Sequence, residues 1–314
     1  MAGSKSLAEC FGRRLAAYRD QDTGSSPGIT AEGSADFIDP SMIIQHTDNI
    51  RMQTMTFETI KTEIIDHAYI ITFNRADKRN AISTVVMGEM MAAAAEADRD
   101  PNVSGIIITG GMKFFSAGAD LNDAQALETP ADTLAYVKRW HQLCRTFEEH
   151  NKPVIAAIEG FCMTGGCEFA MACDIRVGAQ GSTYAITSAR IGTVAGAGGT
   201  QRLARIVGPA KALEIMFDAD PIEAEEAHRI GLINKVVPDG QALEKARAMV
   251  EHYATRAPLS HAFIKHTVYT GLQMDLVSSL DYESFIVATV YGTADRREGI
   301  NAFFEKRKPD FKGK

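Results

Sequence analysis

One carboxylate in a glycine-rich turn is the clearest candidate for chemistry in this chain. Glu168 follows Gly165 and Gly166, and an apolar run at residues 169–173 comes directly after it. Burial in such surroundings disfavours the charged carboxylate and shifts its pKa, which allows it to exchange protons near neutral pH. The alternative is a capping charge in the first turn of a helix. The segment therefore predicts an acid/base carboxylate.

Two glycine-containing loops could place backbone amides beside that carboxylate. Gly165 is expected at a helix N-terminus, where N–H groups and partial positive charge favour an anion. The loop at residues 113–121 follows an apolar strand, and the small residues around Gly118 let its backbone approach a ligand closely. Alone, this loop is an ordinary tight turn. Together the two loops predict a pair of amides that converge on one developing oxyanion.

Strands and helices alternate in an order that could position these loops. Strands are predicted at residues 57–65, 68–73, 104–109, 153–158 and 174–179. Helices are predicted at residues 83–99, 130–150, 166–173, 200–207, 210–217, 223–230, 241–256 and 258–272, and from residue 276 onward. The pattern indicates an α/β fold of repeated ββα units followed by a helical C-terminal region.

These segments resemble the crotonase superfamily, the enoyl-CoA hydratase/isomerase proteins, in the same order from about Phe57 to Phe311. Residues 74–81 resemble the family's early coenzyme A loop, with Ala76 where the family usually has proline. The other matching segments are residues 115–121 and 159–174 (the two oxyanion loops), 191–203 (the second-acid segment), 226–238 and 298–311. The resemblance implies a crotonase-like spiral of ββα units, with C-terminal helices that cover the active site and support trimer contacts.

The resemblance also implies a role for each matching residue. The amides of Ala119 and Gly165 would form the oxyanion hole for a thioester carbonyl, and Glu168 would move protons or position water. The second catalytic position holds Ser188, where hydratases of the family usually have a glutamate. The implied substrate and coenzyme A contacts are Lys78, Arg79, Ala81, Ala117, Ala119, Asp120, Leu121, Gly165 and Lys306.

Ser188 leaves the reaction open, because a hydroxyl cannot supply a carboxylate with a tunable pKa. The side chains that could substitute for it are Asp123, Glu128, Tyr136, His141 and Arg190. We expect an enoyl-CoA hydratase/dehydratase, a lyase. The alternatives are an enoyl-CoA isomerase with one carboxylate, an acyl-CoA hydrolase or C–C cleaving crotonase, and a non-catalytic acyl-CoA-binding paralogue.

Composition restricts the classes of protein further. The 314 residues are 45% hydrophobic, enough for a large core, and the formal net charge of -7 gives no general attraction to nucleic acid. No apolar run reaches membrane-spanning length. The five cysteines and eight histidines have no metal-site or disulfide spacing, so we expect no metal and reduced core thiols. A Rossmann phosphate loop at residues 196–199 is disfavoured because Gln201 stands where the fingerprint needs a small residue.

The predicted organisation has three parts. Residues 1–55 are expected to form a disordered extension, with a possible amphipathic helix at 6–18; residues 56–255 form the crotonase core, and 256–314 the helical trimerisation or lid region. Acidic residues near the start favour a cytoplasmic location over the mitochondrial matrix. The expected partners are an acyl-CoA substrate and identical subunits in a homotrimer or hexamer (a dimer of trimers). Coenzyme A would enter as part of the thioester, and no cofactor is expected to stay bound.

Overall fold

Two sheets form the scaffold of the computed structural model, which describes residues 56–314. The predicted extension at residues 1–55 and its helix lie outside this range. The larger sheet has the order β1-β2-β3-β5-β7-β10 and is parallel except for the β1–β2 hairpin. Its strands are β1 (Ile60–Ile65), β2 (Ala68–Phe73), β3 (Gly105–Thr109), β5 (Val154–Ile158), β7 (Ile175–Ala179) and β10 (Lys235–Val237).

A smaller sheet of short strands supports the candidate site. Its strands, in the order β4-β6-β8-β9, are β4 (Phe114–Ser116), β6 (Phe161–Met163), β8 (Thr183–Ala185) and β9 (Ile222–Glu223). The sequence analysis missed these strands and β10, because two or three residues are too few to show an alternating pattern. Since β4, β6 and β8 each follow a strand of the larger sheet, the predicted ββα repeat is confirmed.

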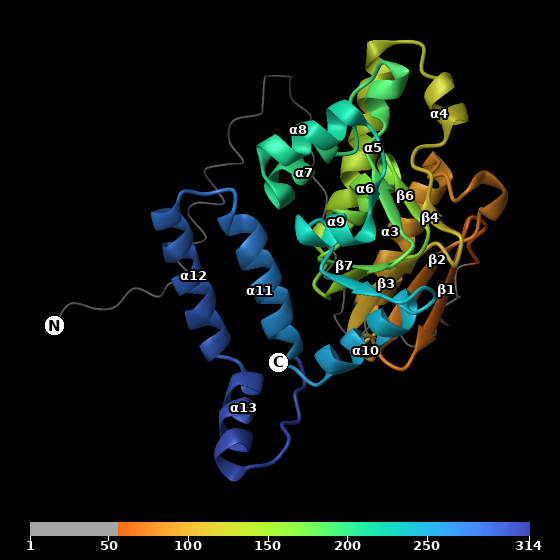
Figure 1. The fold of residues 1–314 in the computed structure, drawn as a ribbon. Helices are drawn as coiled ribbons and strands as arrows, with labels where there is room; N and C mark the ends of the chain where they lie inside the picture. Colours follow the sequence, from red (N-terminus) through yellow and green to blue (C-terminus); the bar gives the residue numbers. More distant parts are fainter. Residues whose placement is uncertain (1–55) are drawn as a thin grey trace, which may run out of the picture. The chain divides into compact units, whose positions relative to one another are not determined.

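Helices cover both sheets and make up most of the C-terminal region (Figure 1). The helices are α3 (Thr84–Arg99), α4 (Leu121–Gln125), α5 (Pro130–Glu148), α6 (Gly165–Ala170), α7 (Gly199–Val207), α8 (Pro209–Asp218), α9 (Ala224–Arg229), α10 (Ala242–Ala254), α11 (Pro258–Gly271), α12 (Leu276–Tyr291) and α13 (Ala294–Glu305). Two 3₁₀ turns are η1 (Ala76–Lys78) and η2 (Ser188–Ile191). The helix predicted at 83–99 begins one residue later because the Ser83 side chain caps it.

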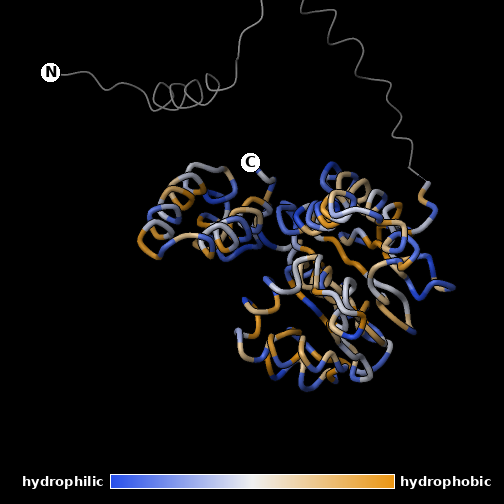
Figure 2. The backbone as a smooth tube through the Cα atoms, turned by 90° about the horizontal axis from the view of Figure 1, so that it is seen from above, coloured by the Kyte–Doolittle hydropathy of each residue, from blue (hydrophilic) through white to orange (hydrophobic). Residues whose placement is uncertain are grey.

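The larger sheet is buried on both faces. Ile107 and Ile155 pack in a cluster with Val250 of α10, whereas Ile106 and Ile108 belong to the main core with α3 and α5. Successive side chains of a strand point to opposite faces of the sheet. One continuous apolar run therefore packs against the helices on both faces. Figure 2 shows hydrophobic positions running through this sheet region and also along the C-terminal helices.

The turn before Glu168 is built differently from the prediction. The left-handed backbone is carried by Gly160 (φ 59°) and Thr164 (φ 44°), whereas Gly165 and Gly166 are already helical. The helix predicted at 166–173 ends at Ala170, because the next residues form tight turns whose carbonyls accept hydrogen bonds from Arg176. These contacts limit α6 to six residues and hold its C-terminal end in place.

Candidate active site

The two predicted oxyanion amides lie side by side. A methyl group on the Gly165 Cα would lie 3.1 Å from the backbone nitrogen of Ala119. Ile82 bridges this loop by donating to the Gly118 carbonyl and accepting from the Asp120 amide, so the Ala119 N–H points away from Ile82. Within residues 56–314, neither the Ala119 nor the Gly165 amide donates to a backbone or side-chain acceptor. Two free donors therefore stand next to each other.

Glycine at position 165 is required by packing. The same methyl group would lie 2.9 Å from Cη2 of Trp140, a buried side chain on α5. The Trp140 ring and the Ala119 amide thus border the same small volume. Any side chain at 165 would therefore crowd both the Trp140 ring and the Ala119 amide.

Thr164 ties the amide pair to the segment that contains Ser188. Its φ of 44° is uncommon for a non-glycine residue. Its N–H donates to the Ala185 carbonyl at 2.7 Å, and its hydroxyl lies 2.6 Å from that of Thr187. Ser188 follows Thr187 and is 5% exposed. The second-acid position is therefore linked to the turn that precedes Gly165.

Glu168 lies one turn beyond Gly165 on α6 and is 2% exposed. Its Oε1 accepts hydrogen bonds from the amides of Ala197 and Gly199, both at 2.8 Å. Burial raises the pKa of the Glu168 carboxyl, while the Gly199 and Ala197 amides and the Arg202 guanidinium act in the opposite direction. A buried carboxyl with a raised pKa can both accept and return a proton.

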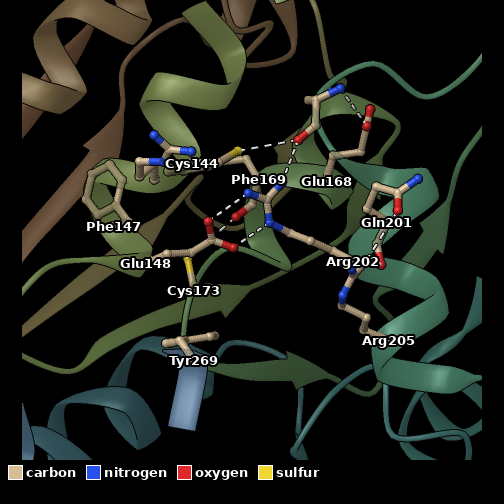
Figure 3. A network of polar contacts seen from close by, with 12 residues as sticks. Cys144, Phe147, Glu148, Glu168, Phe169, Cys173, Gln201, Arg202, Arg205 and Tyr269 are labelled. Atoms are coloured by element: carbon tan, nitrogen blue, oxygen red, sulfur yellow. Dashed lines mark hydrogen bonds and ion pairs between the residues drawn. The ribbon is translucent and has the colours of Figure 1, made fainter. Parts of the chain in front are cut away.

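The loop that holds Glu168 is anchored from α5 and α7 (Figure 3). Arg202 donates from Nη1 to the Ala197 carbonyl at 2.8 Å, and from Nε and Nη2 to Glu148 at 2.5 and 2.7 Å. The Cys144 thiol approaches the same carbonyl at 3.6 Å. Since the Ala197 amide binds Glu168, the Arg202–Glu148 pair positions the carboxylate through one residue of the main chain.

Arg202→Met is expected to lower kcat/KM roughly 10- to 100-fold, because small misplacements of a catalytic group cost about this much. Loss of the guanidinium also raises the pKa of Glu168, so the rising limb of the pH profile should move to higher pH. The measurement is kcat/KM against pH. Arg205→Met on the same helix, where the exposed side chain binds Gln201, is the matched control. An unshifted profile would contradict the role of Arg202.

The predicted coenzyme A loop is joined to the first oxyanion loop. The Ala117 amide donates to the Arg79 carbonyl at 3.0 Å, and the Ser116 hydroxyl to the Asn80 carbonyl at 2.7 Å. The Asn80 side chain is buried and donates to three carbonyls between residues 110 and 115. Lys78 and Arg79 are exposed beside it. The sequence analysis assigned no role to Asn80, although its place between the basic residues and Ala81 marks where the loop turns inward.

Three other predicted contact residues lie in different surroundings. The Asp120 carboxylate caps α4 through Asn122 and accepts from Arg75 Nη2 at 2.9 Å. These bonds lower the Asp120 pKa against the raising effect of its burial. Leu121 is exposed. Lys306 ends α13 and has no hydrogen bond or ion pair with the 78–81 loop in the described part of the chain, so its proposed contact stays a prediction.

Four of the five suggested substitutes for the second acid are exposed or already engaged. Asp123 accepts from the Thr84 amide at 2.7 Å, His141 contacts the Gly196 carbonyl at 3.1 Å, and Arg190 pairs with Asp220. Glu128 is exposed. The fifth, Tyr136, has a buried hydroxyl.

The remaining expectations concern metal sites, membrane spans, the cysteines and the glycine-rich loop at residues 196–199. Over residues 56–314 no group of three or more acidic, histidine or cysteine side chains could hold a metal ion, and no helix is long and apolar enough to cross a bilayer. The four cysteines of this range are buried free thiols, whereas Cys10 lies outside it. Gly198 is left-handed and precedes α7, but η2 and a loop come before it instead of a strand, which rejects the Rossmann interpretation.

Comparison with known proteins identifies the family. Residues 64–314 match the family model described as enoyl-CoA hydratase/isomerase. A probable mitochondrial enoyl-CoA hydratase of Dictyostelium discoideum is 36% identical over 259 residues, covering 82% of this chain and 92% of that protein. A short-chain-enoyl-CoA hydratase of Clostridium acetobutylicum is 35% identical over 240 residues, covering 76% and 92%.

Solved structures agree with the sequence comparisons. The enoyl-CoA hydratase of Bacillus anthracis superposes with a TM-score of 0.78 at 33% identity, covering 82% of this chain and all of that one (100%). The Pseudomonas aeruginosa protein DspI superposes with a TM-score of 0.79 at 30% identity, covering 83% and 100%. The resemblance inferred from the loops is thereby confirmed, and the chain belongs to the enoyl-CoA hydratase/isomerase family of the crotonase superfamily.

Proposed function

We propose that this protein adds water to trans-2-enoyl-CoA thioesters and catalyses the reverse dehydration. The observation that carries this proposal is the pair of free amides at Ala119 and Gly165, with the buried Glu168 carboxylate one helical turn away. The names of the relatives from Dictyostelium discoideum and Clostridium acetobutylicum support the same reaction.

The mechanism starts at the thioester carbonyl, whose oxygen accepts from the Ala119 and Gly165 amides. Glu168 takes a proton from water while the water oxygen bonds to Cβ, and the electron pair of the double bond moves toward the carbonyl as an enolate. The two amides stabilise that charge; one such donor is worth roughly 3–4 kcal/mol. Protonated Glu168 then delivers its proton to Cα, so one water is consumed and the carboxylate is regenerated.

Ser188 supports a second candidate, isomerisation of the double bond. A single carboxylate can remove a proton from one carbon of the enoyl group and return it to another through the same enolate. No net water is gained in that reaction. Ser188, at the place where the family's hydratases usually have a second glutamate, is compatible with this one-acid reaction.

Product mass distinguishes these reactions. The purified full-length chain would be incubated with a panel of trans-2- and trans-3-enoyl-CoA thioesters and the products analysed by mass spectrometry. Hydration adds one water, isomerisation leaves the mass unchanged, and hydrolysis releases free coenzyme A. We expect a gain of one water that Glu168→Gln abolishes. Wild-type protein that binds the thioesters but converts none of them would favour the binding paralogue.

Ser188→Glu is expected to raise hydration of a short trans-2-enoyl-CoA, because it supplies the second carboxylate at a buried position. The added charge costs stability, roughly 1–3 kcal/mol, so the melting temperature must be measured with the rate. Ser188→Gln, of similar size but without a charge, is the control. A folded Ser188→Glu protein that is no faster than the wild type would favour the one-carboxylate reaction.

Neutralising Lys78 and Arg79 together should raise the KM for acyl-CoA and weaken its dependence on salt. The phosphates of coenzyme A are anionic, and both side chains are exposed on the loop that is bonded to the first oxyanion strand. The measurement is KM at several ionic strengths for Lys78→Gln/Arg79→Gln. Neutralising Lys235 and Lys245, which belong to other elements, is the control. A KM of the double variant equal to that of the wild type would mean that the coenzyme A phosphates bind away from Lys78 and Arg79.

The remaining parts of the proposal concern assembly, domains and location. Large hydrophobic side chains are exposed on the C-terminal helices, among them Val277, Phe285, Phe303 and Phe304. Burying them against identical subunits would stabilise a homotrimer or a hexamer, which makes residues 256–314 the assembly or lid region. Relatives include mitochondrial and bacterial proteins, and a cytoplasmic location is our preference.

A further inference from the structure

One buried polar group on α5, the helix that carries Trp140, has no well-placed hydrogen-bond partner in the described part of the chain. The Tyr136 hydroxyl is inaccessible, and within residues 56–314 it makes no hydrogen bond of good geometry. Buried hydroxyls are normally paired, because burial without a hydrogen-bond partner destabilises the folded state. Such a group is unfavourable for stability unless it meets a partner that the folded chain alone does not supply.

The position of Tyr136 points to the oxyanion site. It lies on α5 one turn before Trp140, and the two rings make an edge contact with centroids 6.5 Å apart and an interplanar angle of 82°. Trp140 in turn borders the volume at Gly165 that the Ala119 amide also borders. Ala119 and Tyr136 both pack against the same core cluster. Tyr136 therefore contacts the same indole ring that lies beside Gly165.

The hydroxyl proton is available for donation. Burial raises the pKa of Tyr136, a poorly aligned hydrogen bond from the Trp140 N–H lowers it, and the carboxylates of Asp123 and Asp120 raise it again. The phenol therefore stays protonated at neutral pH. Neither carboxylate accepts that proton within residues 56–314, since the hydroxyl has no acceptor at hydrogen-bond geometry there; Asp120 binds Arg75 and Asn122, and Asp123 binds the Thr84 amide.

We propose that the Tyr136 hydroxyl donates a hydrogen bond to the acyl part of the bound thioester, as a catalytic residue additional to the amide pair and Glu168. This inference rests on the proposed function, because it requires a thioester at Ala119 and Gly165. A neutral donor beside the amides strengthens its bond as negative charge develops on the acyl group. Tyr136 thereby offers a polar contact that does not depend on a carboxylate at position 188.

Tyr136→Phe is a sharp test because it removes a hydroxyl that has no hydrogen bond of good geometry within residues 56–314. We expect an unchanged or higher melting temperature, a kcat for crotonyl-CoA lowered about tenfold or more, and weaker binding of butanoyl-CoA, a saturated thioester that cannot be hydrated. Titration calorimetry gives the affinity. Tyr184→Phe is the control, since the Tyr184 hydroxyl is buried 2.9 Å from that of Ser182 and its removal should lower the melting temperature.

The two thioesters separate this inference from the proposed reaction. If crotonyl-CoA is not hydrated by the wild type but Tyr136→Phe still weakens butanoyl-CoA binding, the contact stands and the reaction assignment fails. Unchanged kcat and unchanged butanoyl-CoA affinity in Tyr136→Phe would overturn the contact. A melting temperature that falls as in Tyr184→Phe would overturn it too, since the hydroxyl would then have a structural role.

Discussion

Glu168→Gln is expected to lower kcat by about 10²–10⁴-fold, the usual contribution of a positioned acid/base group. An amide cannot take a proton from water at neutral pH. The glutamine oxygen can still accept from the Ala197 and Gly199 amides, which now lie 2.8 Å from Glu168 Oε1, so the loop keeps its place. The affinity for a saturated acyl-CoA should therefore change only a few-fold. Rates from product formation and affinities from calorimetry test both parts.

Stability separates loss of chemistry from loss of fold in this variant. Burial raises the pKa of Glu168 in the folded protein, so the folded state binds this proton more tightly than the unfolded chain does. The glutamate thus lowers the free energy of unfolding as pH rises through its folded-state pKa. Glutamine does not ionise, so the free energy of unfolding of the variant has no such decrease with pH. The variant should therefore melt no earlier than the wild type at neutral pH. Glu225→Gln, at an exposed position of α9, is a control for removal of a carboxylate away from the site. Activity of Glu168→Gln within a few-fold of wild type would refute the assigned role.

Gly165→Pro is expected to abolish measurable turnover and weaken thioester binding. Proline removes the amide that faces the Ala119 amide, and one such donor is worth roughly 10²–10³ in kcat. The φ of proline suits the first position of α6, but proline favours extended backbone at the residue before it, whereas Thr164 has φ 44° and ψ -115°, so the turn is strained as well. The added carbon atoms also meet Trp140, since a Cβ at this position would lie 2.9 Å from its ring.

Gly165→Ala separates the amide from the packing effect, because alanine also has a Cβ but keeps the N–H. We expect alanine to weaken binding through its contact with Trp140, and proline to lose about a further 10²-fold in kcat. Melting temperatures of both variants would be compared before the kinetics. Equal kcat values for folded alanine and proline variants would remove the Gly165 amide from the mechanism.

The sequence determined the family, the main strands and the principal candidates for chemistry. Long apolar strands such as residues 153–158 and helices such as 241–256 have enough residues for a periodic pattern, so their type was predicted correctly. Glu168 was identifiable because a carboxylate among glycines and apolar residues is costly unless it has a function. The order of the loops along the chain was sufficient to recognise the family, and the comparisons confirmed this assignment.

Only the tertiary structure decided which groups meet. The strands of the smaller sheet have two or three residues each, and their pairing depends on partners more than 20 residues away in the chain. The Arg202–Glu148 pair spans 54 residues, and Trp140 approaches Gly165 across the core. No local pattern encodes such contacts, because they arise when separate helices pack into one volume. The sequence could therefore name Tyr136, but the burial of its hydroxyl and the contact of its ring with Trp140 are properties of the fold alone.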